Sequence, residues 1–295
     1  EVLRSGWITT GKHAAHFEEV LSELAGGRPV RALTSATAGL EIALLVAGVG
    51  PGDEVIVPAL SFVASANVVL RIGARPVFVD VDLKTRNINI DQIEAAITAR
   101  TKALMPVHFA GLPVDLDRLY ALAKEHGLRV IEDAAHAIGS RWRGGAIGAL
   151  GDLVCFSFHP NKTITTIEGG ALVLANAEEA AQVELHRFHG LRRDAEGESE
   201  VYLAGGKANL TDVAAAVGLG QLARLGEFVR RRQHLAWRYL DALADWHVGE
   251  LPERGDDGHS WHIFTMLLPF DRMGLTRTGF IRAMRALGIG IGIHY

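Results

Sequence analysis

The sequence predicts an α/β protein built on a largely parallel sheet of about seven strands. Short runs rich in Val, Ile and Phe recur along the chain, and helical patterns lie between several of them. Because a parallel strand pair needs a long crossover connection, this alternation indicates a sheet flanked by helices. The expected strands are 30–34, 54–59, 76–82, 102–109, 129–133, 152–159 and 171–175.

Helices are expected around and between these strands. Residues 12–25 show an amphipathic pattern, and residues 40–50 are the most apolar helical stretch, which is too short to span a bilayer. Residues 190–206 read as a polar, Gly-rich loop. Further helical patterns cover 91–99, 115–126, 176–189 and 213–225.

The pattern changes after residue 225. A long Arg-rich helix starts at residue 226, and we expect an αβα element from the segments 261–268, 278–287 and 289–295. The chain therefore divides into a large domain over residues 1–225 and a smaller C-terminal α+β domain over residues 226–295.

The composition is that of an ordinary globular chain. Of its 295 residues, 48% are hydrophobic and 22% charged, and the net charge of -4 gives no reason to expect nucleic acid or a membrane as partner. The single cysteine, Cys155, excludes a disulfide framework and is expected to be buried in its strand. Residues 1–11 lack a charged-then-apolar signal pattern, which favours a cytoplasmic protein.

Lys162 is the residue around which we interpret the rest. It follows strand 152–159 by a few residues, after Pro160, and precedes a Gly-Gly turn at Gly169 and Gly170. Most loop lysines are solvated. A lysine held at a strand exit among apolar neighbours loses hydration, which lowers its pKa and makes it usable for a Schiff base or a proton transfer.

Other residues that could bind a ligand occur where strands end. Ligands of parallel sheets gather at the carboxyl ends of the strands, where Phe62, His108 and Ser157 stand in this sequence. Residues 35–39 place small hydroxyl residues at the start of a helix, which is an anion site or simply a helix cap.

Asp133, which leaves a buried strand, needs a cationic partner. One interpretation makes Asp133, His136 and His108 metal ligands, but no further residue falls at a convincing ligand spacing and we expect no metal. In the other, Asp133 pairs with a protonated ring nitrogen of a cofactor that Lys162 holds covalently. Pyridoxal 5'-phosphate (PLP) has both features.

The chain resembles the DegT/StrS family of PLP-dependent sugar aminotransferases, which have the aspartate-aminotransferase-like fold. The resemblance spans nearly the whole chain. Within the family the chain is most similar to the branch of the UDP-4-amino-4-deoxy-L-arabinose aminotransferase, on the basis of residues 35–39 and of His136. The motifs that carry it are 5–11, 51–56, 106–108, 131–136, the Lys162 segment and 209–212.

The resemblance implies roles for individual residues. It makes Lys162, Asp133 and His136 the catalytic residues, with L-glutamate as amino donor and a nucleotide-linked 4-keto sugar as acceptor. It also implies a homodimer with shared active sites. Lys162 would bind PLP covalently, Asp133 would pair with the ring nitrogen, Phe62 would stack on the ring, His136 would lie beside its 3-oxygen, Thr37, Ala38 and Ser157 would bind its phosphate, and Asn209 would reach the phosphate of the neighbouring subunit.

Trp7, His189 and Tyr295 are candidates for lining the sugar pocket. The chain departs from the family in two ways: Ile167 stands where Gly is common, and the family continues at both ends, so we expect the small domain to be incomplete. Two alternatives stay open, a non-catalytic relative and an enzyme that acts on a cyclitol ketone. Lys162 argues against a dehydratase on the same fold.

Overall fold

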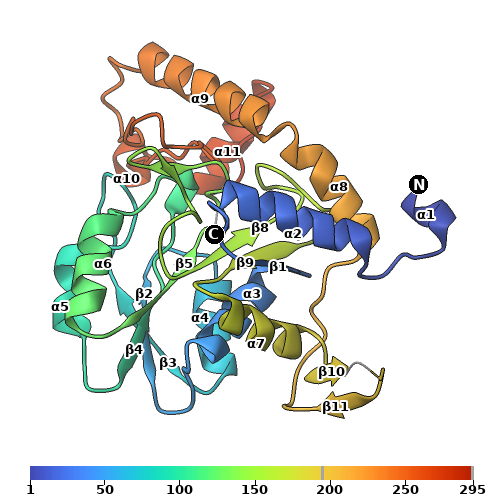
Figure 1. Cartoon of the computed structure of the whole chain (residues 1–295). Coiled ribbons are helices and arrows are strands. Elements are labelled where there is room, and N and C mark those ends of the chain that lie inside the picture. Colours follow the sequence, from blue (N-terminus) through green and yellow to red (C-terminus); the bar gives the residue numbers. More distant parts are fainter. Residues whose placement is uncertain (194–195, 294–295) are drawn as a thin grey trace.

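The structure, a computed structural model that describes residues 1–193 and 196–293, is built around one seven-stranded sheet (Figure 1). The strand order is β1-β9-β8-β5-β4-β2-β3, and β9 runs antiparallel to both of its neighbours while the other pairs are parallel. This confirms the predicted fold class. The strands are β1 (Val30–Leu33), β2 (Glu54–Pro58), β3 (Arg75–Val79), β4 (Thr101–Leu104), β5 (Arg129–Asp133), β8 (Leu153–Ser157) and β9 (Gly170–Val173).

Helices cover both faces of this sheet. One face packs against α2 (Lys12–Leu24), α5 (Ile93–Ala96), α6 (Leu116–Glu125) and, through α2, α8 (Asp212–Leu222). The other face packs against α3 (Ala36–Val46), α4 (Ala64–Arg71) and α7 (Ala177–Arg187). The result is a three-layer α/β/α arrangement with two hydrophobic cores.

Successive residues of a strand enter opposite cores. On β5, Val130 lies in the core under α2 and α6, whereas Ile131 lies in the core under α3 and α4. The same alternation sends Glu132 to the α6 side and Asp133 to the α4 side. Two neighbouring acids therefore face different environments.

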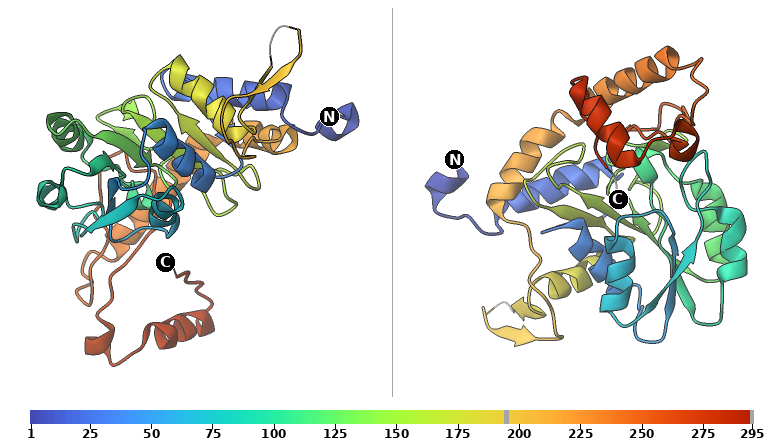
Figure 2. Two further views of the ribbon diagram at one scale, coloured as in Figure 1. Left: turned by 90° about the horizontal axis from the view of Figure 1, so that it is seen from below. Right: turned by 180° about the vertical axis from the view of Figure 1, so that it is seen from behind.

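The C-terminal part gathers on the side of the molecule away from α7 (Figure 2). It contains α9 (Leu225–Ala242), α10 (Phe270–Met273) and α11 (Arg277–Ala286). The αβα element predicted here is wrong, since residues 261–268 contain only one isolated bridge, between Glu250 and Leu267, and residues 289–293 have no regular structure. The domain boundary at residue 225 stays a prediction.

The remaining elements are short. Residues 190–206 include a hairpin of β10 (Leu191–Arg193) and β11 (Ser199–Val201), which the sequence pattern did not predict. A second hairpin joins β6 (Arg141–Trp142) to β7 (Gly145–Ala146). Helix α1 (Val2–Ser5) projects from the body, and two 3-10 turns are η1 (Ile90–Gln92) and η2 (Phe109–Gly111) (Figure 1). Among the described residues, no helix combines the length and apolar character needed to cross a membrane.

Candidate active site

Asp133 is the best-defined acid at the carboxyl edge of the sheet. It is the last residue of β5, is 5% exposed, and accepts hydrogen bonds from the Ser65 hydroxyl at 3.0 Å and from the Ala135 amide at 3.1 Å. Burial raises the pKa of Asp133, while these two donors and the positive charge of Lys162 act in the opposite direction. The carboxylate is thus fixed in orientation, and a cationic partner would stabilise it.

Lys162 lies in the loop that joins β8 to β9, close enough to Asp133 for the two charges to interact. Burial lowers the pKa of its amine, and the Asp133 carboxylate raises it in part. Backbone bonds hold the loop: Lys162 donates to His159 at 2.9 Å, and Thr166 donates to Phe158 at 3.0 Å. The sequence-based expectation of a partly dehydrated lysine agrees with this environment.

Ile167, in the same loop, stands where the family commonly has Gly, and its backbone conformation is strained. Ile167 has a φ of 76° and its side chain is largely exposed. A β-branched residue is strained in this left-handed conformation, which glycine adopts freely. The strain falls five residues from Lys162 in the sequence, at the turn before Gly169 and Gly170.

The N-terminus of α3 lies directly beside Ser157. Ser35 caps the helix by accepting a hydrogen bond from Ala38 at 3.1 Å. Ser157 pairs with Gly170, and a Cβ atom on Gly170 would lie 2.4 Å from the carbonyl carbon of Ser35. Only glycine allows this approach, which brings the first turn of α3, with Thr37, to the carboxyl edge. The amides of a helix's first turn and the Ser157 hydroxyl form an anion-binding arrangement.

Phe62 lies in the segment just before α4. It is 54% exposed and lines a cavity of about 420 Å³ together with Ser61 and Ser65. The Ser61 and Ser65 hydroxyls are 2.5 Å apart, and Ser65 in turn bonds Asp133. The aromatic ring and the two hydroxyls therefore line one cavity, and Ser65 connects that cavity to the Asp133 carboxylate.

The histidines do not adopt the arrangement that metal ligation needs. His108 accepts a hydrogen bond on Nδ1 from the Val114 amide at 3.1 Å, and its Nε2 lies 2.8 Å from Glu132. Glu132 also accepts a hydrogen bond from Tyr120 at 2.6 Å, on the α6 side of the sheet. His108 is therefore occupied by a buried network that faces away from Asp133. Across residues 1–193 and 196–293, no cluster of three or more His, Cys, Asp or Glu side chains is arranged to hold a metal.

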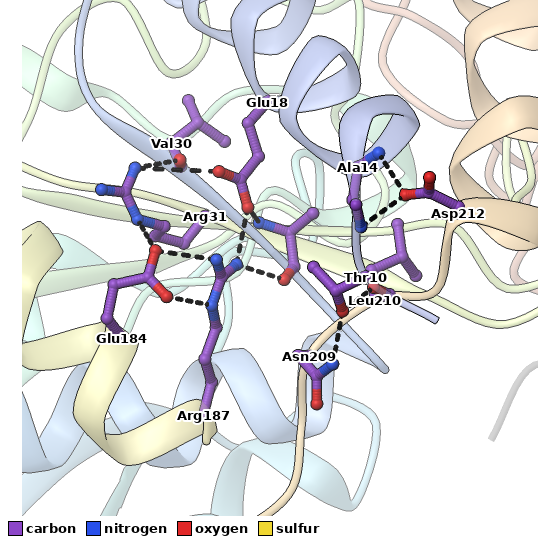
Figure 3. Close-up of polar contacts among 12 residues, drawn as sticks. Thr10, Ala14, Glu18, Val30, Arg31, Glu184, Arg187, Asn209, Leu210 and Asp212 are labelled. Carbon is purple, nitrogen blue, oxygen red and sulfur yellow. Dashed lines mark hydrogen bonds and ion pairs between the residues drawn. The ribbon is translucent and has the colours of Figure 1, made fainter. Parts of the chain in front are cut away.

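Asn209 lies outside this group, beyond the edge strand β1. Its backbone pairs with Leu33. Its side-chain amide donates to the Thr10 hydroxyl (Figure 3) and accepts from Lys207. Thr10 in turn donates to the carbonyl oxygen of Leu210 at 2.6 Å. Asn209 is therefore buried and held between Thr10 and Lys207.

Trp7 and His189, two of the candidates for the sugar pocket, make their contacts with other residues. Trp7 is largely exposed and donates to the Thr10 carbonyl at 3.0 Å, and the His189 ring packs on Phe188. Tyr295 lies outside the described residues.

Ser65 is the contact of Asp133 that sequence reasoning missed, together with Ser61, which bonds Ser65. The signal was present as two serines four residues apart, which share one face of a helical turn. It went unused because helix α4 itself was not predicted.

Comparison with known proteins gives a consistent set of similarities. A model of the DegT/DnrJ/EryC1/StrS aminotransferase family matches residues 1–295. Spr1654 from Streptococcus pneumoniae, described as a candidate sugar aminotransferase and solved in its pyridoxamine phosphate (PMP) form, is 33% identical over 100% of this chain and 79% of its own, with a TM-score of 0.92.

Two further solved structures are similar to the same degree. PseC from Helicobacter pylori, an aminotransferase involved in the biosynthesis of pseudoaminic acid, is 31% identical over 100% of this chain and 80% of its own, with a TM-score of 0.93. DesV from S. venezuelae is 36% identical over 98% of this chain and 76% of its own, with a TM-score of 0.91.

Proposed function

We infer the reaction of this chain from the premise that it belongs to the DegT/DnrJ/EryC1/StrS aminotransferase family. It is a PLP-dependent sugar aminotransferase, and pyridoxal phosphate is its cofactor. The residues at the carboxyl edge fit that cofactor. The observation that carries the fit is the pairing of a buried carboxylate, Asp133, with a partly dehydrated amine, Lys162, beside a helix N-terminus that suits a phosphate.

Each part of the site would hold one part of PLP. Lys162 would bind the aldehyde carbon, Asp133 would keep a proton on the ring nitrogen, and the exposed face of Phe62 would stack on the ring. The first turn of α3, with Thr37 and Ala38, and the Ser157 hydroxyl would hold the phosphate. His136 would lie beside the 3-oxygen, and Asn209, held between Thr10 and Lys207, would reach the phosphate of a second subunit.

When bound, PLP supplies an electron sink for the bond that breaks at Cα of the amino donor. The chain supplies the proton transfers. Because burial lowers the pKa of Lys162, a larger share of its amine is neutral and able to accept the Cα proton. Asp133 would keep the ring nitrogen of the bound cofactor protonated, and Ser65 holds the carboxylate in a fixed orientation.

We propose L-glutamate as donor and a nucleotide-linked 4-keto sugar as acceptor, with the UDP-linked arabinose series as the first acceptor to try. The amino group leaves glutamate, which becomes 2-oxoglutarate, and ends on the sugar carbon that carried the keto oxygen. We further propose a homodimer with shared sites that works in the cytoplasm for surface polysaccharide, lipopolysaccharide or lipid A. Residues 1–225 would bind PLP, and residues 226–295 would form the smaller domain.

The first experiment tests the cofactor and its lysine together. Wild type, Lys162→Ala and Lys124→Ala, which removes an exposed lysine on α6, are incubated with PLP and then reduced with borohydride. We expect a visible absorbance band in the wild type and in Lys124→Ala, and after reduction a covalent adduct that peptide mass spectrometry finds on Lys162. A band of equal strength and stability in Lys162→Ala would exclude the proposed role of Lys162.

The second experiment tests the reaction. The loaded protein is mixed with L-glutamate and then with UDP-linked or dTDP-linked 4-keto sugars. We expect 2-oxoglutarate to form and the mass of one acceptor to change by the replacement of its keto oxygen with an amino group. Transfer to a cyclitol ketone, with none to any nucleotide sugar, would contradict the proposed substrate class.

A further inference from the structure

A short buried segment connects the C-terminal part of the chain to the candidate site. We call it the strap, and it comprises residues 258–262, with the sequence Gly-His-Ser-Trp-His. Its backbone runs alongside η2: the amide of Ser260 donates to Gly111 at 3.2 Å and the amide of His262 donates to Ala110 at 2.8 Å. A Cβ atom on Gly111 would lie 2.4 Å from the Ser260 hydroxyl, so glycine is needed for this approach.

Helix α9 holds the other side of the strap. The Arg232 guanidinium donates to the carbonyl oxygen of His262 at 2.8 Å, and the Gln233 amide donates to that of His259 at 3.1 Å. The strap is therefore bonded on one side to the first helix of the C-terminal part and on the other to the loop that follows β4.

The strap holds Ala110 in an unusual conformation. Ala110 has φ 58° and ψ 5°, a left-handed conformation that costs a residue with a Cβ about 1–2 kcal/mol. Its carbonyl oxygen accepts two hydrogen bonds from the strap, from the His262 amide and from Nε2 of His259 at 3.2 Å. A carbonyl oxygen only accepts, so Nε2 of His259 carries the proton. Burial lowers the pKa of His259 to about 4, which keeps this ring neutral.

This conformation directs the Ala110 amide at His136. The amide donates to Nδ1 of His136 at 3.2 Å, and because a backbone N–H can only donate, that nitrogen carries no proton. The proton of the neutral His136 ring is therefore on Nε2. The His262 ring packs on the His136 ring with centroids 4.4 Å apart, and Phe109 lies 6.1 Å away at its edge.

We propose that the strap is a positioning element for His136. By fixing Ala110 it selects the tautomer of His136 with the proton on Nε2, the nitrogen that can donate to the 3-oxygen of PLP. Only that last step rests on the proposed function. His259 and Arg232 act through Ala110 and His262 and are positioning residues.

The sharpest test is His259→Phe, because it keeps an aromatic ring against Trp261, 3.8 Å away, and removes only the donor to Ala110. The protein is labelled with ¹⁵N-histidine and studied without cofactor, and the His136 signals are assigned by their loss in His136→Gln. In the wild type we expect one protonated and one unprotonated ring nitrogen. In His259→Phe we expect both signals to move toward the average of two tautomers, and PLP binding to weaken about tenfold.

Two controls separate positioning from general loss of stability. Tyr120→Phe removes buried hydrogen bonds on the α6 face and should leave the His136 signals unchanged. His259→Gln keeps a nitrogen donor and should retain the wild-type signals. If His259→Phe does not fold, Arg232→Met removes the α9 donor to the His262 carbonyl and should move the His136 signals in the same direction.

The outcomes distinguish this proposal from the proposed function. A single His136 tautomer in His259→Phe or, should it not fold, in Arg232→Met overturns the positioning role even when PLP binds normally. An equal change in Tyr120→Phe overturns it as well. A tautomer change in a protein that binds no PLP supports the positioning role and contradicts the cofactor site.

Discussion

Replacing Gly170 by alanine tests how α3 is placed against the sheet. The added Cβ would lie 2.4 Å from the carbonyl carbon of Ser35 and 2.5 Å from the amide nitrogen of Ala36. Carbon atoms in contact are about 3.5–4 Å apart, so the first turn of α3 must move by about 1 Å. The contacted atoms belong to the backbone and cannot rotate away. A Cβ on Gly39 would meet the Cys155 sulfur at 2.6 Å, which shows how closely the same helix packs on β8.

The structure sets the size of the effect. Overpacking of this kind lowers the free energy of unfolding by about 1–3 kcal/mol. At about 2.1 cal/mol/K of unfolding entropy per residue, a chain of this length loses about 2–5 °C in Tm. Moving the amides of α3 away from the phosphate also weakens a charge-assisted hydrogen bond worth about 1.5–3 kcal/mol, so PLP binding falls about 10- to 100-fold.

The assay pairs thermal unfolding of the cofactor-free protein with a PLP titration followed by visible absorbance. Gly50→Ala is the matched control, because an added Cβ there meets no atom within 4 Å and Gly50 has no left-handed backbone angle. The control should stay within about 0.5 kcal/mol of the wild type. If both variants melt and bind PLP alike, the close approach of α3 to β9 does not position the phosphate site.

Three further outcomes are expected. Gly220→Ala on α8 should raise the free energy of unfolding by about 0.5–1 kcal/mol, because an added Cβ there meets no atom within 4 Å. Gly218→Ala on the same helix should lower it, because its Cβ would lie 2.6 Å from an aromatic ring of α2. Urea titrations compare the two variants, and equal effects would contradict the packing of α8 on α2. Ile167→Gly should raise the free energy of unfolding by about 0.5–1 kcal/mol, because glycine adopts the left-handed conformation of this position without strain. A lower free energy of unfolding in the same urea titration would show that Ile167 is not strained. Burial lowers the pKa of Lys162 below 10.5, so between the folded and unfolded pKa values the folded protein binds fewer protons and the cofactor-free wild type gains stability as pH rises. Near neutral pH, Lys162→Met should have a free energy of unfolding about 0.5–2 kcal/mol larger than the wild type and therefore a higher Tm, and its stability should not rise with pH in the same way. A lower Tm would refute the cost of burying the Lys162 amine.

The sheet was predictable because its strands are locally encoded. β5 occupies the predicted residues 129–133, since an apolar run between charged ends has one consistent pairing in a buried sheet. The predicted strand 102–109 was too long: β4 ends at Leu104, just before Pro106, which lacks an amide hydrogen for the ladder. Lys162 and Asp133 could be brought together in advance because both follow parallel strands, whose carboxyl ends meet at one edge.

The strap and helix α4 were not predictable in the same way. Residues 258–262 have no periodic pattern, and what buries them is hydrogen bonding to Ala110 and Gly111, far away in the sequence. Helix α4 opens with small residues around Ser65 that favour no single element, and its contacts with α3, β2 and β3 settle its conformation. Tertiary contacts decided both segments.

The position of β9 governs how this chain must fold during synthesis. Strand β1 has β9 as its neighbour in the sheet, so Val30 and Leu33 have no strand to pair with until residues 170–173 have been made. At about 5–20 residues per second, the roughly 140 residues between the two strands take about 7–28 s. The N-terminus of α2 waits longer, because the Asp212 carboxylate that accepts the Ala14 amide at 2.9 Å comes later still (Figure 3). A nascent chain therefore carries an unpaired apolar strand until residues 170–173 have been made, and we expect a chaperone to bind that strand during this interval.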